Sequence, residues 1–263
     1  MAERDRFNLT DKRVLLVGAT GILGRGYASA IVEAGAKLAI ADLSTSDVIE
    51  FAETIGAVGI EMDVADEQSV VDGVQTAIDR LGGLDGAITN SAATGEFLMK
   101  EGDAFAPFEE YPLSAWQRAL DINLTGTFLV AREAGRAMKA GGGGSLVTVS
   151  SIYGIVAPDH RMYENQPFKS FASYSASKAG VIGLTKWLST WWGRDGIRVN
   201  SVTPGGVFND HNEEFSSAYG DRTPMGRMAD RDELVGMVVF LLSDASSYCT
   251  GQNYIVDGGL STW

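Results

Sequence analysis

The chain has 263 residues, of which 45% are hydrophobic, and it carries a formal net charge of −13 at pH 7. This length is compatible with one α/β domain, and the apolar fraction is sufficient for a large core. The strong negative charge argues against nucleic acid or an anionic membrane surface as the main partner.

The composition also bears on compartment and metal binding. Cys249 is the only cysteine, so the chain cannot form an internal disulfide, which is typical of proteins in a reducing compartment. His160 and His211 are the only histidines, and with one cysteine they form no recognisable zinc cluster, so we expect no metal. The charged segment Met1–Arg13 lacks the apolar core of a signal peptide, and no apolar run is long enough to span a membrane. These features predict a soluble, cytoplasmic protein.

The first predicted strand is the continuous apolar run 14–17, which is typical of a strand buried on both faces of a sheet. It leads directly into the glycine-rich segment Gly18–Gly24, and a helical pattern follows and ends near Gly35. Glycines at a strand-to-helix turn allow the backbone to approach a pyrophosphate, which the helix N-terminus stabilises. The turn therefore indicates a dinucleotide site, although the motif alone also occurs in ordinary turns.

The second predicted strand, Lys37–Ala41, ends in Asp42. This acid lies 24 residues after Gly18 (42 − 18), close to the roughly 20 at which dinucleotide-binding folds place a ribose-binding acid. A carboxylate there accepts hydrogen bonds from the adenosine 2′-hydroxyl and repels a 2′-phosphate, so the sequence predicts NAD rather than NADP as cofactor. The alternative interpretation of Asp42 is a helix N-cap or a solvated strand end.

Strands and helices continue to alternate along the chain. Further strands are predicted at Val58–Met62, Gly86–Thr89, Ser145–Val149, Ile197–Val202 and Asn253–Val256, and further helices at Ser44–Thr54, Asp66–Leu81, Ser114–Ala140 and Asp232–Leu242. This alternation predicts an α/β fold, a single-domain doubly wound parallel sheet (Rossmann fold) over residues 1–263, with about seven strands and helices on both faces. Ligands of such sheets bind beyond the carboxyl ends of the strands, where Asp42, Asp63 and Asn90 are expected.

A helical pattern beginning near Ala172 places Tyr174 and Lys178, four residues apart, on one helical face. A nearby ammonium favours the phenolate, so we expect Lys178 to lower the pKa of Tyr174 and to make it a proton donor and acceptor near neutral pH. Ser151, at the end of the preceding strand, could hold a carbonyl or alkoxide oxygen by hydrogen bonding. The three side chains predict the oxidation of an alcohol or the reduction of a ketone, although a tyrosine and a lysine at this spacing also occur on ordinary surface helices.

Several separated motifs together resemble those of the classical short-chain dehydrogenase/reductase family. The resemblance covers nearly the whole chain, and its ordered motifs are Gly18–Gly24, Asp42, Asp63-Val64, Asn90–Ala93, Asn123, Ser150-Ser151, Tyr174–Lys178, Asn200, Pro204-Gly205 and Val256–Gly259. It implies that Tyr174 is the general acid/base, that Lys178 also bonds the nicotinamide ribose, and that Ser151 polarises the substrate oxygen. Asn123 matches the helix residue that holds a water for proton relay. The alternative for Asn123 is a buried asparagine that satisfies helix backbone groups.

The same resemblance implies the residues that bind the cofactor. They are Gly18, Thr20, Gly21, Ile22, Leu23, Gly24, Asp42, Leu43, Asp63, Val64, Asn90, Ser91, Ala92, Tyr174, Lys178, Pro204, Gly205 and Val207. The chain departs from the family pattern at three places: Gly21 stands one position before the usual middle glycine, Ser91 and Ala93 replace consensus residues, and Asn209 replaces a threonine expected after Pro-Gly. The glycine spacing is similar to that of the extended branch of the family, but 263 residues leave little room for that branch's added substrate domain.

Ser151 and Tyr174 are 23 positions apart (174 − 151), farther than in most family members. The intervening segment is rich in hydrogen-bonding side chains, which suit a polyhydroxylated ligand such as a sugar or sugar acid. The residues expected to contact substrate are Ser151, Tyr153, His160, Tyr163 and Tyr174. The alternative is that the segment is an exposed loop or a subunit contact. Substrate loops are expected at about 94–111, 152–171 and 207–228, and in the last, a polar loop, Phe215, Tyr219 and Met225 could close over the ligand.

The favoured function is an NAD-dependent oxidoreductase that interconverts a secondary alcohol and a ketone in a small-molecule substrate. The alternatives are a reductase of apolar carbonyl or acyl substrates, an enzyme that epimerises or dehydrates through a transient ketone, and a non-catalytic nucleotide-sensing or scaffold protein. Trp187, Trp191 and Trp192 follow Lys178 on its helix and belong either to the core or to a subunit interface. The family resemblance implies a homodimer or homotetramer.

Overall fold

The structure is a computed structural model that describes residues 6–263, apart from the side chains of Glu96 and Glu101. Residues 1–5, which belong to the predicted domain and to the charged opening segment, lie outside the described residues. The strands are β1 (Arg13–Val17), β2 (Lys37–Asp42), β3 (Val58–Glu61), β4 (Gly86–Thr89), β5 (Gly144–Val149), β6 (Ile197–Pro204) and β7 (Asn253–Val256). The helices are α1 (Ile22–Glu33), α2 (Val48–Ile55), α3 (Glu67–Leu81), α4 (Gly95–Leu98), α5 (Leu113–Leu120), α6 (Gly126–Ala140), α7 (Ala172–Trp192), α8 (Glu213–Gly220) and α9 (Val235–Leu242).

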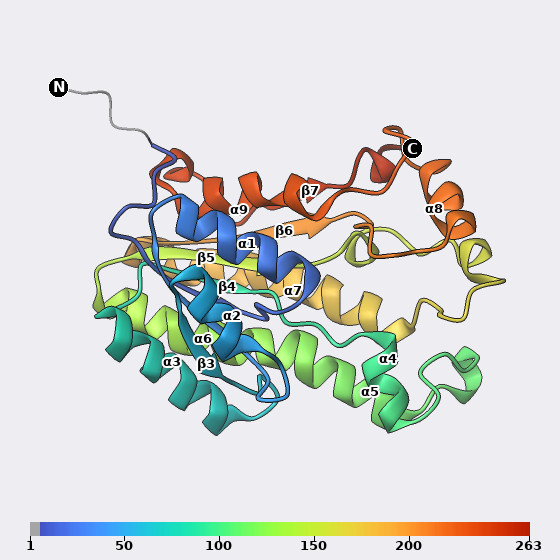
Figure 1. The fold of residues 1–263 in the computed structure, drawn as a ribbon, viewed down its shortest axis with the longest axis horizontal. Helices are drawn as coiled ribbons and strands as arrows, with labels where there is room; N and C mark the ends of the chain where they lie inside the picture. The colour runs from blue at the N-terminus through green and yellow to red at the C-terminus, as the bar shows by residue number, and fades with distance from the viewer. Residues whose placement is uncertain (1–5) are drawn as a thin grey trace.

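The seven strands form one parallel sheet in the order β3-β2-β1-β4-β5-β6-β7. The chain runs outward from β1 to β3, returns to β4 beside β1, and then runs outward in the opposite direction to β7 (Figure 1). This order confirms the predicted doubly wound α/β fold. It also places the reversal of strand order between β1 and β4, the point at which such sheets bind ligands.

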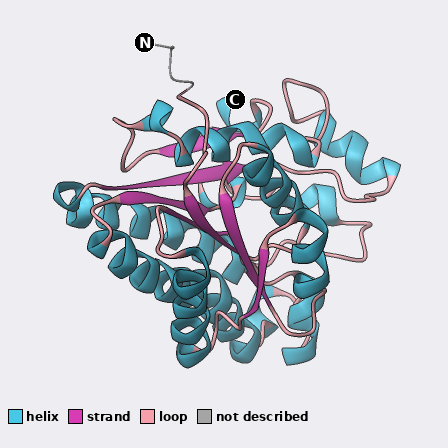
Figure 2. Ribbon diagram, turned by 60° about the vertical axis from the view of Figure 1, so that its left-hand side comes forward, coloured by secondary structure: helices cyan, strands magenta, loops and turns pink. Residues whose placement is uncertain are grey.

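Helices cover both faces of the sheet (Figure 2). Successive side chains of a strand point to opposite faces, so Leu15 and Val17 pack into the core with α3, α6 and α7, whereas Val14 and Leu16 pack into the core with α1, α2 and α9. This burial on both faces explains why β1 is a continuous apolar run. No helix within residues 6–263 combines the length and apolar character needed to cross a bilayer.

The long helix predicted over 114–140 is interrupted. A π turn, Asp121–Thr125, joins α5 to α6 and contains the buried Asn123. A π turn accommodates one extra residue and is frequently found at functional sites. The apolar spacing on which the helix prediction was based cannot show it, because the helix continues on both sides.

The polar loop predicted over 207–228 contains helix α8, so that prediction is wrong in part. Asn212 caps the helix, since its Oδ1 accepts a hydrogen bond from the Phe215 amide at 2.8 Å. Phe215 and Tyr219, four residues apart, are buried. Two large apolar residues in eight give too weak a stripe to predict a helix from spacing alone. Two other helices start later than predicted. The predicted starts are Ser44 and Asp232, whereas the α helices begin at Val48 and Val235.

Candidate active site

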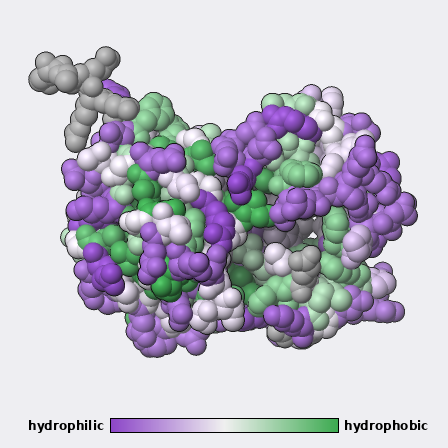
Figure 3. Space-filling model, in the orientation of Figure 1, coloured by the Kyte–Doolittle hydropathy of each residue, from purple (hydrophilic) through white to green (hydrophobic). Residues whose placement is uncertain are grey.

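A cavity of about 410 Å³ lies at the carboxyl end of the sheet. The first residues of α1, the ends of β4, β5 and β6, and the first turns of α7 line its inner part, and residues of the segments 152–171 and 205–228 line its outer part. In the space-filling view a hollow with apolar residues inside opens between the body of the sheet and the region of α4, α5 and α8 (Figure 3). The strands of a parallel sheet all present their carboxyl ends here, so residues distant in sequence meet in one place.

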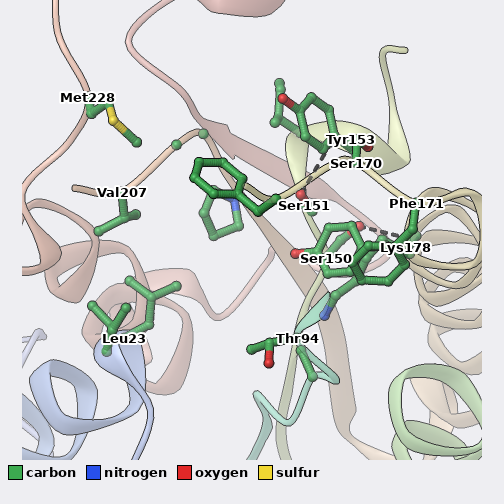
Figure 4. A pocket seen from close by; sticks show the side chains of 18 of the residues that line it. Leu23, Thr94, Ser150, Ser151, Tyr153, Ser170, Phe171, Lys178, Val207 and Met228 are labelled. Carbon is green, nitrogen blue, oxygen red and sulfur yellow. Dashed lines mark hydrogen bonds between the residues drawn. The ribbon is translucent and has the colours of Figure 1, made fainter. Parts of the chain in front are cut away.

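Ser151, Tyr174 and Lys178 all line this cavity. The Lys178 Nζ lies 5.8 Å from the centroid of the Tyr174 ring and donates a hydrogen bond to the Val149 carbonyl at 2.9 Å. The Ser150 hydroxyl donates to the Lys178 carbonyl at 2.8 Å and so ties the end of β5 to α7. Figure 4 shows Ser151 and Lys178 across the cavity from Leu23 and Val207. The fold therefore brings together the serine, tyrosine and lysine that the sequence singled out.

Burial governs the protonation of the tyrosine and the lysine. Burial raises the pKa of Tyr174, and hydrogen bonding by Ser151 opposes this rise without cancelling it. Burial lowers the pKa of Lys178 to about 8. The prediction that Lys178 lowers the pKa of Tyr174 is wrong for the protein without a bound cofactor. The ammonium is directed at the Val149 carbonyl, and loss of solvation favours the neutral phenol.

Asn123 is fully buried in the π turn. Its Oδ1 accepts a hydrogen bond from the Ala93 amide at 2.7 Å, and its Nδ2 donates to the Ser177 hydroxyl at 3.0 Å. Both polar groups of the side chain are thus paired, one with the turn after β4 and the other with α7 next to Lys178. The asparagine is buried, as the alternative interpretation expects, but its backbone partner belongs to the turn after β4 and not to a helix.

Two glycines of the turn between β1 and α1 stand where no larger residue fits. Gly18 has a φ of +82°, and a Cβ there would lie 2.5 Å from the Ser91 nitrogen. A Cβ on Gly24 would lie 2.3 Å from the Gly18 carbonyl oxygen, which in turn accepts a hydrogen bond from Asn90 Nδ2 at 2.7 Å. Gly21, the N-cap residue of α1, has no side chain to cap the helix, so the first amides of α1 stay available to an anion. The turn therefore fits a pyrophosphate.

A second, smaller cavity of about 190 Å³ lies at the ends of β2 and β3. Its lining includes Asp42, Leu43, Asp63, Val64 and Ser91. Ala92–Thr94 border both this cavity and the larger one, so the two are adjacent parts of one groove along the sheet edge. An extended dinucleotide has this shape, with one end near Asp42 and the other near Tyr174.

Asp42 is fixed by the glycine turn. Its Oδ2 accepts hydrogen bonds from the Thr20 amide at 2.8 Å and the Thr20 hydroxyl at 2.7 Å, and its Oδ1 accepts one from the Leu43 amide at 2.9 Å. Arg25 is anchored close by through the Thr20 carbonyl, at 3.0 Å, and its guanidinium pairs with Asp47 at 2.6 Å. The guanidinium that is bonded to this turn is thus already paired with a carboxylate.

The predicted substrate residues divide between two places. Tyr153 and Tyr163 line the main cavity, and their hydroxyls lie 2.6 Å apart. His160 does not line it but borders a separate cavity of about 590 Å³ beside Phe105 and Pro107. Met225, expected to close over the ligand, is 62% exposed and lies outside the lining of the main cavity, because it follows α8 rather than forming part of its buried face.

The sequence reasoning did not identify Phe168, Lys169 and His211, which also line the main cavity. All three lie within the predicted substrate loops, but loop position alone does not tell which side chains point inward. The outer wall is held together by its own hydrophobic cluster, in which Tyr163 and Phe168 pack against Phe215 of α8. Segment 152–171 and helix α8 therefore form one wall of the cavity.

Comparisons with known proteins agree with this geometry. A family model described as "Enoyl-(Acyl carrier protein) reductase" matches residues 18–261. Trans-4-hydroxycyclohexanecarboxylate dehydrogenase from Sinomonas cyclohexanicum is 34% identical over 262 residues, which cover 95% of this chain and 93% of that protein.

Two solved structures extend the comparison. A short-chain type dehydrogenase/reductase from Mycobacterium marinum superposes with a TM-score of 0.86 at 32% identity, with 99% of both chains covered. A gluconate 5-dehydrogenase from Burkholderia cenocepacia J2315, in complex with NADP and tartrate, superposes with a TM-score of 0.87 at 29% identity, with 98% of both chains covered. The chain thus belongs to the short-chain dehydrogenase/reductase family and is an alcohol oxidoreductase that uses a nicotinamide cofactor.

Proposed function

We propose that the protein is an NAD-dependent dehydrogenase that interconverts a secondary alcohol and a ketone in a polyhydroxylated substrate such as a sugar or sugar acid. The observation that carries this proposal is the meeting of Ser151, Tyr174 and Lys178 in one cavity, which continues along the sheet edge to Asp42. The similarity to a gluconate 5-dehydrogenase supports the substrate class.

The side chains have distinct roles in this proposal. In the oxidation direction, Ser151 Oγ holds the substrate oxygen by hydrogen bonding, and Tyr174 Oη takes the proton from the substrate hydroxyl. Lys178 Nζ, held by the Val149 carbonyl, lies beside the phenol and within reach of a cofactor ribose. A bound nicotinamide supplies the hydride acceptor. In the reduction direction Tyr174 Oη returns the proton to the carbonyl oxygen.

The cofactor would lie along the groove. The amides of the Gly18–Gly24 turn would hold the pyrophosphate, and Pro204, Gly205 and Val207, at the end of β6, would contact the nicotinamide. Asp42 supports NAD over NADP, because a fixed carboxylate accepts a bond from a ribose 2′-hydroxyl and repels a 2′-phosphate. The pairing of Arg25 with Asp47 supports the same choice, since it leaves less charge available for a 2′-phosphate.

A second candidate substrate class is favoured by the cavity walls. Ile152, Phe168, Phe171, Phe215 and Met228 give the outer part of the cavity a largely apolar lining. Such walls suit an alcohol or ketone with a hydrocarbon body, and the similar protein from Sinomonas cyclohexanicum is named for a cyclohexane ring.

We further propose that the chain acts as a single domain and forms a homodimer or homotetramer. Trp192 packs in the core, whereas Trp187 and Trp191 are 57% and 64% exposed and stack on each other with ring centroids 5.3 Å apart. Two adjacent exposed indoles on one helix are the type of surface that protein interfaces cover. Trp192 thus has a core position, whereas the exposure of Trp187 and Trp191 supports the interface interpretation for these two residues.

The test is a substrate panel followed at the absorbance of reduced nicotinamide, with NAD and NADP in parallel. The panel contains sugar acids, polyols, hydroxycyclohexanecarboxylates and apolar ketones. Turnover of polyhydroxylated substrates, with a higher kcat/KM for NAD, is expected. Turnover of apolar ketones alone would favour the second candidate class. No net formation of free NADH, with product nevertheless released, would indicate epimerisation or dehydration, and no turnover at all would contradict a catalytic function.

A further inference from the structure

The outer part of the main cavity contains a positive charge that has no acidic partner among the described side chains. Lys169 lines the cavity, and its Nζ donates hydrogen bonds to the carbonyls of Tyr163 and Glu164, the latter at 3.0 Å. An ammonium has three N–H donors, so one remains. None of the ion pairs formed among the described side chains of residues 6–263 involves Lys169.

The other charged groups of the cavity do not compete for an anionic substrate. Within the described part of the chain no aspartate or glutamate lines the cavity, and Lys178 is the only other lysine or arginine that does. Lys178 is already bonded to the Val149 carbonyl, and burial lowers its pKa to about 8. Burial also lowers the pKa of His211, which favours the neutral form of this lining histidine. Lys178 lies beside Tyr174 at the reacting end of the cavity, so Lys169 is the charged side chain that is left for a part of the substrate that does not react.

The location of Lys169 suits recognition of the part of the substrate that does not react. Ser170 and Phe171, the next two residues, border the cavity close to Ser151 and Tyr153 (Figure 4). Lys169 also borders the neighbouring cavity near His160, so its ammonium lies at the outer boundary of the main cavity. The chain has a net charge of −13, and its overall field repels anions. The ammonium of a residue that lines the cavity, held by two carbonyls, is the local feature that offsets this repulsion.

We propose that Lys169 binds a carboxylate of the substrate, and that the preferred substrate is a hydroxy acid in which this carboxylate lies away from the reacting secondary alcohol. The proposal rests on the proposed function and narrows its substrate class. The proposal applies equally to a polyhydroxylated substrate and to one with an apolar ring, because Lys169 binds the carboxylate and not the rest of the substrate. The competing role for Lys169 is structural, since the same ammonium also caps the carbonyls of Tyr163 and Glu164.

The experiment compares each hydroxy acid with a neutral analogue in which a hydroxymethyl group replaces the carboxylate. Gluconate is paired with glucitol, and 4-hydroxycyclohexanecarboxylate with 4-(hydroxymethyl)cyclohexanol. The variants are Lys169→Met, Lys169→Arg and Lys186→Met. The last is the matched control, because Lys186 is an exposed lysine on the outer side of α7 and its replacement changes the net charge equally.

Wild-type protein is expected to prefer the hydroxy acid. Lys169→Met should lower kcat/KM for the hydroxy acid by roughly tenfold or more, mainly through KM, as expected when one charge-assisted hydrogen bond is lost, and should change the neutral analogue by less than about twofold. Lys169→Arg should restore part of the preference, and Lys186→Met should leave it unchanged.

Three results would overturn the proposal. The first is an equal loss of kcat/KM on both substrates in Lys169→Met, which indicates that Lys169 only caps the carbonyls. The others are no loss of kcat/KM on either substrate and a wild-type preference for the neutral analogue. Calorimetric titration of the hydroxy acid into wild type and Lys169→Met separates this proposal from the proposed function. Binding that depends on Lys169 in the absence of any turnover would support the carboxylate site while contradicting the dehydrogenase. Turnover without dependence on Lys169 would do the reverse.

Discussion

At the residue scale, the choice of cofactor depends on Asp42. Its carboxylate is oriented by Thr20 and Leu43 at the end of β2 and lines the smaller cavity. In Asp42→Ala both the acceptor for the ribose 2′-hydroxyl and the repulsion of a 2′-phosphate are lost. We expect the ratio of kcat/KM for NAD to that for NADP to fall by roughly tenfold or more. Steady-state kinetics with both cofactors measures this ratio.

The control for this substitution is Thr20→Val. It removes the hydroxyl that donates to Asp42 at 2.7 Å but keeps the carboxylate and the amide that also donates to it. The preference for NAD should therefore persist. An unchanged cofactor ratio in Asp42→Ala would show that another group selects the cofactor, and the N-cap or strand-end interpretation of Asp42 would then hold.

The pKa values of Tyr174 and Lys178 predict opposite pH dependences for the two reaction directions. Oxidation needs the phenolate of Tyr174 to accept a proton, and burial raises the pKa of that phenol. The oxidation rate should therefore increase with pH through the alkaline range. Reduction needs the protonated phenol, so its rate should be highest near neutral pH and fall as pH rises. Initial rates of both directions between about pH 6 and about pH 10 test this sign. An oxidation rate that decreases across this range would contradict it.

The sequence could predict the identity of these residues but not their electrostatics. Tyr174 and Lys178 are recognisable because four-residue spacing on a helix is local information. The partner of the Lys178 ammonium, the Val149 carbonyl, comes from a strand 29 residues away, and burial of the pair is a property of the folded cavity. For the same reason the proposed role of Lys169 could not be predicted. It depends on the absence of acidic side chains from the cavity lining, and the sequence does not show which residues form that lining.

At the element scale, two glycines near the start of α1, Gly21 and Gly24, allow a controlled test of how closely α1 packs against the turn. A Cβ on Gly24 would lie 2.3 Å from the Gly18 carbonyl oxygen and 2.7 Å from the Ala19 backbone, and backbone cannot move away as a side-chain end can. A Cβ on Gly21, whose φ is −68°, would meet no protein atom within 4 Å. Gly24→Ala should therefore lower the free energy of unfolding by about 1–3 kcal/mol, whereas Gly21→Ala should change it by less than about 0.5 kcal/mol.

Urea denaturation of both variants measures these changes, with equal slopes indicating that only the native state has been altered. Similar stability losses in the two variants would mean that the turn tolerates no side chain anywhere. Equal and negligible losses would mean that α1 can move away from β1. The first result would contradict the open space around Gly21, and the second would contradict the close approach at Gly24 on which the cofactor cradle depends.

Elements differ in how much of them the sequence predicts. The predicted ends of β1, β2 and β4 lie within one residue of the observed ends, because apolar runs bounded by polar residues are local signals. The π turn at Asn123 was not predicted, since the helical pattern continues on both sides of it. Helix α8 was missed because its buried face consists of Phe215 and Tyr219, whose burial depends on segment 152–171.

At the scale of the whole molecule, the doubly wound sheet follows from regular alternation of strands and helices, and from the short connections that keep the crossovers in one sense. The alternation predicts parallel strands but does not by itself give their order. The order β3-β2-β1-β4-β5-β6-β7 sets the groove between β1 and β4, and with it the relation of Asp42 to Tyr174. The order of the motifs was therefore predictable, whereas the shape of the cavity was not.

Assembly is the other property of the whole molecule. If the stacked pair Trp187 and Trp191 lies in a subunit interface, the wild-type protein should sediment as a dimer or tetramer, and Trp191→Glu should shift it toward the monomer, because burying a carboxylate at an interface is costly. Tyr248→Glu is the control, since Tyr248 is fully exposed and does not belong to α7. Sedimentation of wild type as a monomer would show that the two indoles remain exposed.

The most direct measurement is the single-turnover rate of NADH formation by Tyr174→Phe, compared with wild type on the best substrate of the panel. The cavity is predicted to keep its shape, because the ring remains, and NADH binding followed by fluorescence should be unchanged. The rate of hydride transfer should fall by roughly a hundredfold to ten-thousandfold, the range expected when a general acid/base is removed. A variant that binds NADH normally and forms it at close to the wild-type rate would contradict the assignment of the phenol as the proton-transferring group.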